Sequence, residues 1–159
     1  MKAIEPDLRA GGKDLIITLK KKGYRLALAR RGAVSDDDLA LAKRLGVMIL
    51  VKGRGLNDEV IELPLGKGKA DVYTISTRAR RLNVKPSDGA VLVNLKDYAT
   101  NYLPLSRLIE RNPGTKFLFT VGPARPEDVR DPRDLLAFLV KVLGMDERRA
   151  LNSITRWPP

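Results

Sequence analysis

The chain has 159 residues, with 30 Lys plus Arg against 19 Asp plus Glu, and so a formal charge of +11. It contains no Cys and no His, which excludes disulfides, thiolate metal sites, cysteine nucleophiles, a Ser–His–Asp triad and His-ligated metal centres. The length is sufficient to bury a core, and we expect one globular domain over residues 1–159.

Strand-like and helix-like patterns alternate along the chain. The expected strands are short apolar runs at 1–6, 24–29, 47–51, 60–65, 70–75, 89–95 and 116–121. The expected helices, with their caps, cover 11–22, 35–46, 104–111, 131–144 and 146–155. Ser35, Asp131 and Asp146 stand where N-caps are expected. This alternation predicts parallel β/α topology, and it leaves open both an abbreviated β/α barrel and an open doubly wound sheet.

The charge predicts the class of partner. A strongly basic surface attracts phosphate backbones, so a nucleic acid is the first partner to expect, although thermophile proteins are also often basic. The absence of Gln, together with many Lys and Arg, indicates a thermophile. No uncharged stretch approaches the ~20 apolar residues of a membrane span, and the N-terminus carries no leader pattern. We therefore expect a cytoplasmic protein.

The glycines and acids give weak signals for enzyme chemistry. The glycine-rich segments at 53–55 and 66–69 lack the third Gly or the Lys-Ser/Thr pair of phosphate-binding loops, and the second of them is interpreted as a hairpin turn. Most acids stand at capping positions. Asp7 is the one acid near a strand end, where barrel enzymes carry catalytic groups.

Clusters of Arg and Lys are the candidates for RNA contact, because Arg binds phosphate through two parallel hydrogen bonds. They are Arg125, Arg130 and Arg133 before a helix, Arg78, Arg80 and Arg81 after a strand, Arg30 and Arg31 after another, and Lys20, Lys21 and Lys22 at a helix end. The lysines could equally complement the helix dipole, and Arg130 could instead brace Asp134. No strand has the RNP-like aromatic pattern that stacks bases, so we expect recognition of backbone and shape.

Residues 117–158 carry a resemblance to a known family. They contain Phe-Leu-Phe-Thr-Val-Gly-Pro-Ala-Arg-Pro-Glu-Asp-Val-Arg-Asp-Pro-Arg-Asp-Leu, then Leu-Gly-Met, Ala-Leu-Asn-Ser-Ile and a terminal Pro. This pattern resembles the end of the thirty-kilodalton-type protein subunit (component 3) of archaeal and eukaryal ribonuclease P. Thr120 and Val121 stand where that family has serines before the glycine. Upstream, the resemblance consists only of the strand–helix alternation.

The resemblance implies an abbreviated TIM-like barrel of about seven mostly parallel strands, shorter than the family's by at least one β/α unit. It also implies a protein without catalytic residues that binds the ribonuclease P RNA and a small ferredoxin-like protein subunit. Such a subunit supports 5′-leader removal from precursor tRNA, which it contacts indirectly. It binds no cofactor or metal, and Mg²⁺ is used by the RNA. The alternative is a small α/β enzyme acting on a phosphorylated metabolite, with Asp7 and Lys52 near strand ends.

Overall fold

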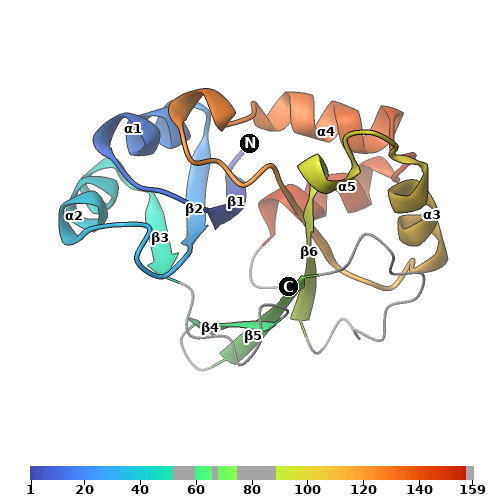
Figure 1. The fold of residues 1–159 in the computed structure, drawn as a ribbon, viewed down its shortest axis with the longest axis horizontal. Coiled ribbons are helices and arrows are strands. Elements are labelled where there is room, and N and C mark those ends of the chain that lie inside the picture. The colour runs from blue at the N-terminus through green and yellow to red at the C-terminus, as the bar shows by residue number, and fades with distance from the viewer. Residues whose placement is uncertain (52–59, 66–67, 75–88, 157–159) are drawn as a thin grey trace.

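The N-terminal part of the chain forms a three-stranded parallel sheet. The computed structural model describes the backbone of residues 1–51, 60–65, 68–74 and 89–156, and the side chains of 1–50 and 90–156. The sheet contains, in chain order, β1 (Ala3–Leu8), β2 (Tyr24–Ala29) and β3 (Met48–Val51). Two helices connect these strands, α1 (Lys13–Lys21) and α2 (Asp36–Leu45). Both helices pack on one face of the sheet (Figure 1).

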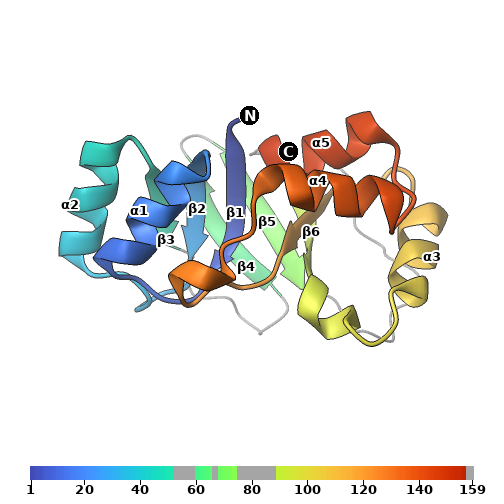
Figure 2. The same ribbon diagram turned by 90° about the horizontal axis from the view of Figure 1, so that it is seen from above.

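The second sheet is mixed. Its strands, in order, are β4 (Val60–Leu65), β5 (Gly68–Thr74), β6 (Gly89–Asn94) and β7 (Phe117–Thr120). The β4–β5 pair is antiparallel, whereas β5, β6 and β7 are parallel. The 3₁₀ helix η1 (Leu95–Tyr98) and α3 (Leu103–Arg111) follow β6; η2 (Pro126–Asp128), α4 (Pro132–Lys141) and α5 (Glu147–Thr155) follow β7. Figures 1 and 2 show α1 and α2 at one end of the molecule and α3 at the other.

The two sheets share an inner core. Ile4, Leu26 and Leu28 of the first sheet form one buried cluster with Leu92 and Leu118 of the second, and β1 lies beside β7. Alternate residues of each strand point the other way, toward the helices: those of β6 and β7 contact α3, α4 and α5. Strands β1, β2, β6 and β7 therefore have helices on one side and residues of the other sheet on the opposite side.

The structure contradicts the predicted abbreviated barrel. The described strands form two separate sheets, with no ladder between β1 and β7, so no closed barrel is present among them. A single doubly wound sheet is also wrong, because its helices would cover both faces. The physical reason lies in residues 60–74, where an antiparallel hairpin stands in place of a parallel β/α unit. The assignment of residues 1–159 to one domain stays a prediction.

The local signals for helix ends are confirmed. Ser35 and Asp38 form a reciprocal capping box at the start of α2, and Gly46 ends this helix at a φ of 72°. The Asp131 carboxylate accepts a hydrogen bond from the Arg133 N–H, and Asp146 caps α5 in the same way. In the part of the chain that the structure describes, no helix is long and apolar enough to cross a membrane.

Candidate functional site

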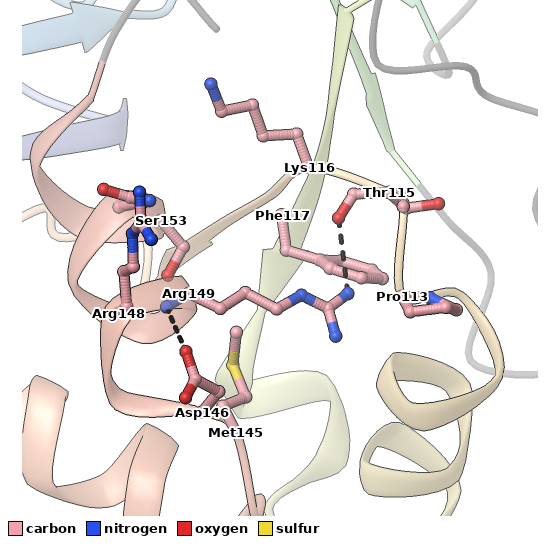
Figure 3. A pocket seen from close by; sticks show the side chains of 11 residues that line it. Pro113, Thr115, Lys116, Phe117, Met145, Asp146, Arg148, Arg149 and Ser153 are labelled. Carbon is pink, nitrogen blue, oxygen red and sulfur yellow. Dashed lines mark hydrogen bonds between the residues drawn. The ribbon is translucent and has the colours of Figure 1, made fainter.

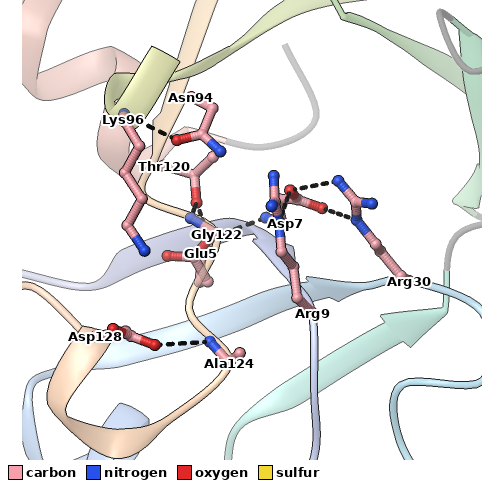
Figure 4. Close-up of polar contacts among 10 residues, drawn as sticks. All are labelled: Glu5, Asp7, Arg9, Arg30, Asn94, Lys96, Thr120, Gly122, Ala124 and Asp128. Carbon is pink, nitrogen blue, oxygen red and sulfur yellow. Dashed lines mark hydrogen bonds and ion pairs between the residues drawn. The ribbon is translucent and has the colours of Figure 1, made fainter. Parts of the chain in front are cut away.

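Polar side chains meet where β1, β2, β6 and β7 reach their carboxyl ends (Figure 4). Asp7, near the end of β1, has a side chain only 1% exposed. Its carboxylate accepts hydrogen bonds from Arg9 Nε at 2.9 Å, from Arg30 Nε at 2.8 Å and from Arg30 Nη2 at 3.0 Å. Two guanidinium groups therefore compensate the charge of this buried acid, as a carboxylate removed from water requires.

A second buried acid joins β1 to β7. Glu5 Oε1 accepts hydrogen bonds from Thr120 Oγ1 at 2.5 Å and from the Asp7 N–H at 2.9 Å, and Thr120 Oγ1 accepts one from the Gly122 N–H at 2.8 Å. Between Glu5 and Leu8, β1 has one residue more than β2. This bulge lies around Pro6, which has no N–H to give to the ladder. The bulge re-aims the two acids toward different neighbouring strands.

These contacts give the acids a structural role. Asp7, the acid suggested for an enzyme, is hydrogen-bonded to side chains from two other positions, and Lys52 lies outside the described residues. Among the described residues, no group of three or more Asp or Glu is placed to hold a metal ion. The cluster ties β1 to the chain segments that follow β2 and β7.

The predicted RNA-binding arginines differ in how much of their charge is compensated. Arg125 is 68% exposed, but its guanidinium lies 3.3 Å from Glu127 and 3.6 Å from Asp128. Backbone hydrogen bonding, first of all from the Ala124 N–H, lowers the pKa of Asp128, so that this acid is charged. Arg30 and Arg31 are both exposed, and Arg30 forms an ion pair with Asp7. Arg78, Arg80 and Arg81 lie outside the described residues.

The loop after β7 brings two predicted sets together. It begins at the carboxyl end of the sheet, where the Arg9 N–H donates to the Pro123 carbonyl. It then reaches the amino end of β2, where Lys22 Nζ donates to the Val129 carbonyl and the Tyr24 hydroxyl to the Arg130 carbonyl, the latter at 2.9 Å. Arg130 therefore lies close to the lysine run; Lys20, Lys21 and Arg133 are exposed.

A basic pocket lies at the amino end of β7 (Figure 3). Its volume is about 330 Å³, and it lies between residues 113–117 and the first turns of α5. Lys116, directly before β7, and Arg148, Arg149 and Asn152 of α5 line it. The spacing of Arg148, Asn152 and Arg156 by four residues puts them on one side of α5.

The two neighbouring arginines of this pocket have different roles. The Arg149 guanidinium donates to the carbonyls of Ile109, Asn112 and Thr115 at 3.2, 2.7 and 3.3 Å. It also lies 5.5 Å from the centre of the Phe117 ring. Arg149 therefore gives the carbonyls at and after the end of α3 an additional donor and ties this segment to α5, and burial lowers its pKa. Arg148 is exposed and available to a ligand.

Positive charge is concentrated around this pocket. Burial lowers the pKa of Lys116, and the nearby Arg156 lowers it further. Arg25 also reaches this region, since its Nη2 donates to the Thr155 carbonyl at 3.0 Å. Asp146 is the one acid among the described residues of the lining, and it caps α5. An anion in the pocket would relieve the repulsion between these cations.

The basic clusters predicted from the sequence to contact RNA do not include the cations around this pocket, which are Lys116, Arg148, Arg149 and Arg156. The four-residue spacing along α5 was the signal that could have found Arg156, whereas nothing local indicates that Lys116 lies beside it.

Comparison with known proteins gives no relative: no family, curated protein or solved structure matches the chain. The resemblance of residues 117–158 therefore stays an interpretation of the sequence, and the function is argued from the geometry.

Proposed function

We propose that this protein binds the phosphate backbone of RNA as a non-catalytic protein subunit of a ribonuclease P. The observation that carries the binding is the position of Lys116 and Arg148, which line the same pocket at the amino end of β7. The charge of Arg156 also acts on Lys116. The sequence pattern of residues 117–158 supports the assignment to ribonuclease P. In this proposal the RNA cleaves the 5′ leader of precursor tRNA with Mg²⁺, and a small ferredoxin-like protein is the second protein partner.

The chemistry of the pocket suits a phosphodiester. Arg can give a phosphate two parallel hydrogen bonds, while Lys acts as a compact charge. At the carboxyl ends of the strands, Arg9 and Arg30 already bind Asp7. At the amino end, Lys116 and the exposed Arg148 line the pocket, and neither has an ion pair with a described acid within it, so a phosphate gains more there. The net charge of +11 adds long-range attraction for a polyanion.

The test measures the affinity for single-stranded RNA and for ribonuclease P RNA over a series of salt concentrations. Lys116→Ala/Arg148→Ala should weaken binding and lower the log–log salt slope by about 1.4, since each lost phosphate contact removes about 0.7 for a single strand. The matched control is Lys43→Ala/Arg44→Ala, which removes the same charge from the last turn of α2, outside the lining of the pocket. It should change the slope much less.

Two results would contradict the binding proposal. Wild-type affinity that does not vary with salt would exclude binding through phosphates. An equal loss in the control variant would show that net charge, and not this pocket, carries the binding.

The ribonuclease P assignment has its own test. The RNA and protein that co-purify with the chain should be a ribonuclease P RNA and a small α/β protein, and adding the chain to them should increase leader removal. Cleavage of precursor tRNA by the purified protein, retained without RNA and abolished by Asp7→Ala, would reverse the assignment to a non-catalytic subunit.

A further inference from the structure

A second pocket lies toward the carboxyl end of β7, between η1, the start of α3 and the first half of α4. Its volume is about 330 Å³, and its walls are mostly apolar. Two half-buried aromatic side chains line it, Tyr102 before α3 and Phe138 in α4. Of the predicted RNA-binding residues that the structure describes, only Arg130 belongs to this lining.

The two aromatic rings form an edge-to-face pair. Their centres are 4.9 Å apart and their planes meet at 73°. Both rings pack against the outer edge of the core around β6 and β7, so their positions are fixed by buried neighbours. An edge-to-face pair leaves ring surface that the partner does not cover, and this surface can stack on a flat group that enters the pocket.

Charged groups surround the apolar walls. Lys96 and Arg130 are exposed cations in the lining, and Asp134 adds a carboxylate. Lys96 also faces Asp128, whose pKa it helps to lower (Figure 4). The pocket thus has aromatic surface that can stack on a flat group, two cations that can bind an anion, and a carboxylate that can accept a hydrogen bond from an amino group. A nucleotide combines all three features.

We propose that this pocket binds one unpaired nucleotide of the RNA, with its base against Tyr102 and Phe138 and its phosphate toward Lys96 and Arg130. The inference rests on the proposed function, which supplies the RNA, and it adds a base contact to recognition that the sequence predicted to involve backbone and shape alone. Stacking on aromatic side chains tolerates any base, so the expected preference is for single strands and not for one sequence.

The test uses a single-stranded RNA that carries 2-aminopurine, whose fluorescence falls when it stacks. Tyr102→Leu/Phe138→Leu keeps apolar volume and removes both rings. We expect the wild type to quench the probe, and the variant to lose the quenching and to bind at least about fivefold more weakly, the lower end for one stacked base. The salt slope should not change, because the phosphate contacts remain. The control, Leu103→Ala, alters an exposed apolar residue outside the lining and should behave as wild type.

A second measurement needs no variant. RNA with 4-thiouridine, cross-linked to the wild type by light, should attach to peptides that contain Tyr102 or Phe138. Cross-links found only in other peptides would overturn the proposal.

Salt-dependent binding without quenching would overturn the base pocket and leave the proposed function intact. No salt-dependent RNA binding would overturn the proposed function itself. If the pocket bound adenosine monophosphate with higher affinity than RNA, its ligand would be a free nucleotide, and the proposal that it binds a nucleotide of the RNA would be wrong.

Discussion

The two ends of the parallel strands carry similar residues with different electrostatic outcomes. At the carboxyl ends, Arg9 and Arg30 bind the buried carboxylate of Asp7. At the amino ends, burial lowers the pKa of Lys116, and the charge of Arg156 lowers it further. A count of basic residues does not distinguish these cations, but their availability to a ligand differs.

The topology explains part of this asymmetry. In a β/α unit the helix starts near the carboxyl end of one strand and ends near the amino end of the next. The helix dipole favours acids in the first turn and bases in the last, and α2 begins with Asp36–Asp38 and ends with Lys43 and Arg44. Likewise, α1 has Asp14 in its first turn and Lys20 and Lys21 in its last. The carboxyl ends thus gain acids and the amino ends gain bases.

The largest effect is expected from Asp7→Asn. It removes the charge that accepts hydrogen bonds from Arg9 and Arg30, and each such charge-assisted bond contributes more than a neutral one. We expect the free energy of unfolding to fall by about 3 kcal/mol in urea denaturation. The variant that remains folded should bind RNA more tightly, because it carries one negative charge fewer at the carboxyl ends. A loss below about 1 kcal/mol, or unchanged RNA affinity, would mean that the two ends do not differ as described.

Arg149→Ala should have the next largest effect. Its guanidinium donates to three carbonyls around the end of α3, so we expect a loss of about 2 kcal/mol in the free energy of unfolding. Arg149→Lys should recover little of it, because an ammonium cannot reproduce the planar set of donors. The adjacent Arg148→Ala is the matched control and should stay within about 0.5 kcal/mol of wild type. Equal losses at the two positions would remove the distinction between a structural and a ligand-binding arginine.

The sequence predicts what is local. Ser35, Asp131 and Asp146 were predicted as caps because a cap depends on residues two or three positions away, and all three are confirmed. Closure of the sheet is not local. It depends on which strands pair across the molecule. The antiparallel β4–β5 pair agrees with the hairpin turn expected at 66–69, but no local pattern indicates that β1 and β7 form no ladder. The predicted barrel was wrong for this reason.

The candidate site was predicted only in part. The composition shows the basic charge, but it does not show which arginines pair with acids. The acids that pair with Arg30 and Arg125 lie at different distances from them along the chain. Glu127 and Asp128 are near Arg125 in sequence, whereas Asp7 reaches Arg30 only after β1 and β2 pair. Tyr102 and Phe138 likewise meet only in the fold.

The predicted loop arginines provide a smaller test in the assembled complex. Arg125→Ala/Arg130→Ala/Arg133→Ala should lower the leader-removal activity of a reconstituted ribonuclease P about tenfold, the equivalent of one lost charge-assisted contact. Lys20→Ala/Lys21→Ala should lower it less. Lys22 is left unchanged because its Nζ donates to the Val129 carbonyl. Melting temperatures identify any unfolded variant. A larger loss in the lysine variant, with the arginine variant folded and active, would place the contact on the lysine run.

The smallest effect is expected from Tyr24→Phe, where the loop from the carboxyl end reaches the amino end of β2. The Tyr24 hydroxyl donates to the Arg130 carbonyl at 2.9 Å, and its loss should lower the free energy of unfolding by about 1 kcal/mol at neutral pH. Burial raises the pKa of Tyr24, and the charges of Glu5 and Asp131 raise it further. Because the unfolded chain then ionises first, near an ordinary pKa of about 10, the stabilising contribution is complete below that pH and is lost as the pH rises above it.

Urea midpoints measured from neutral pH to above pH ~10 should therefore fall more steeply for the wild type than for Tyr24→Phe. Part of the slope should persist in the variant, since burial also raises the pKa of Tyr98. Parallel curves would contradict the role of Tyr24, because the alkaline loss would then arise from other groups. A reduced slope with unchanged neutral stability would separate the two contributions: the hydroxyl would be buried, but its bond to the loop would not hold the two ends together.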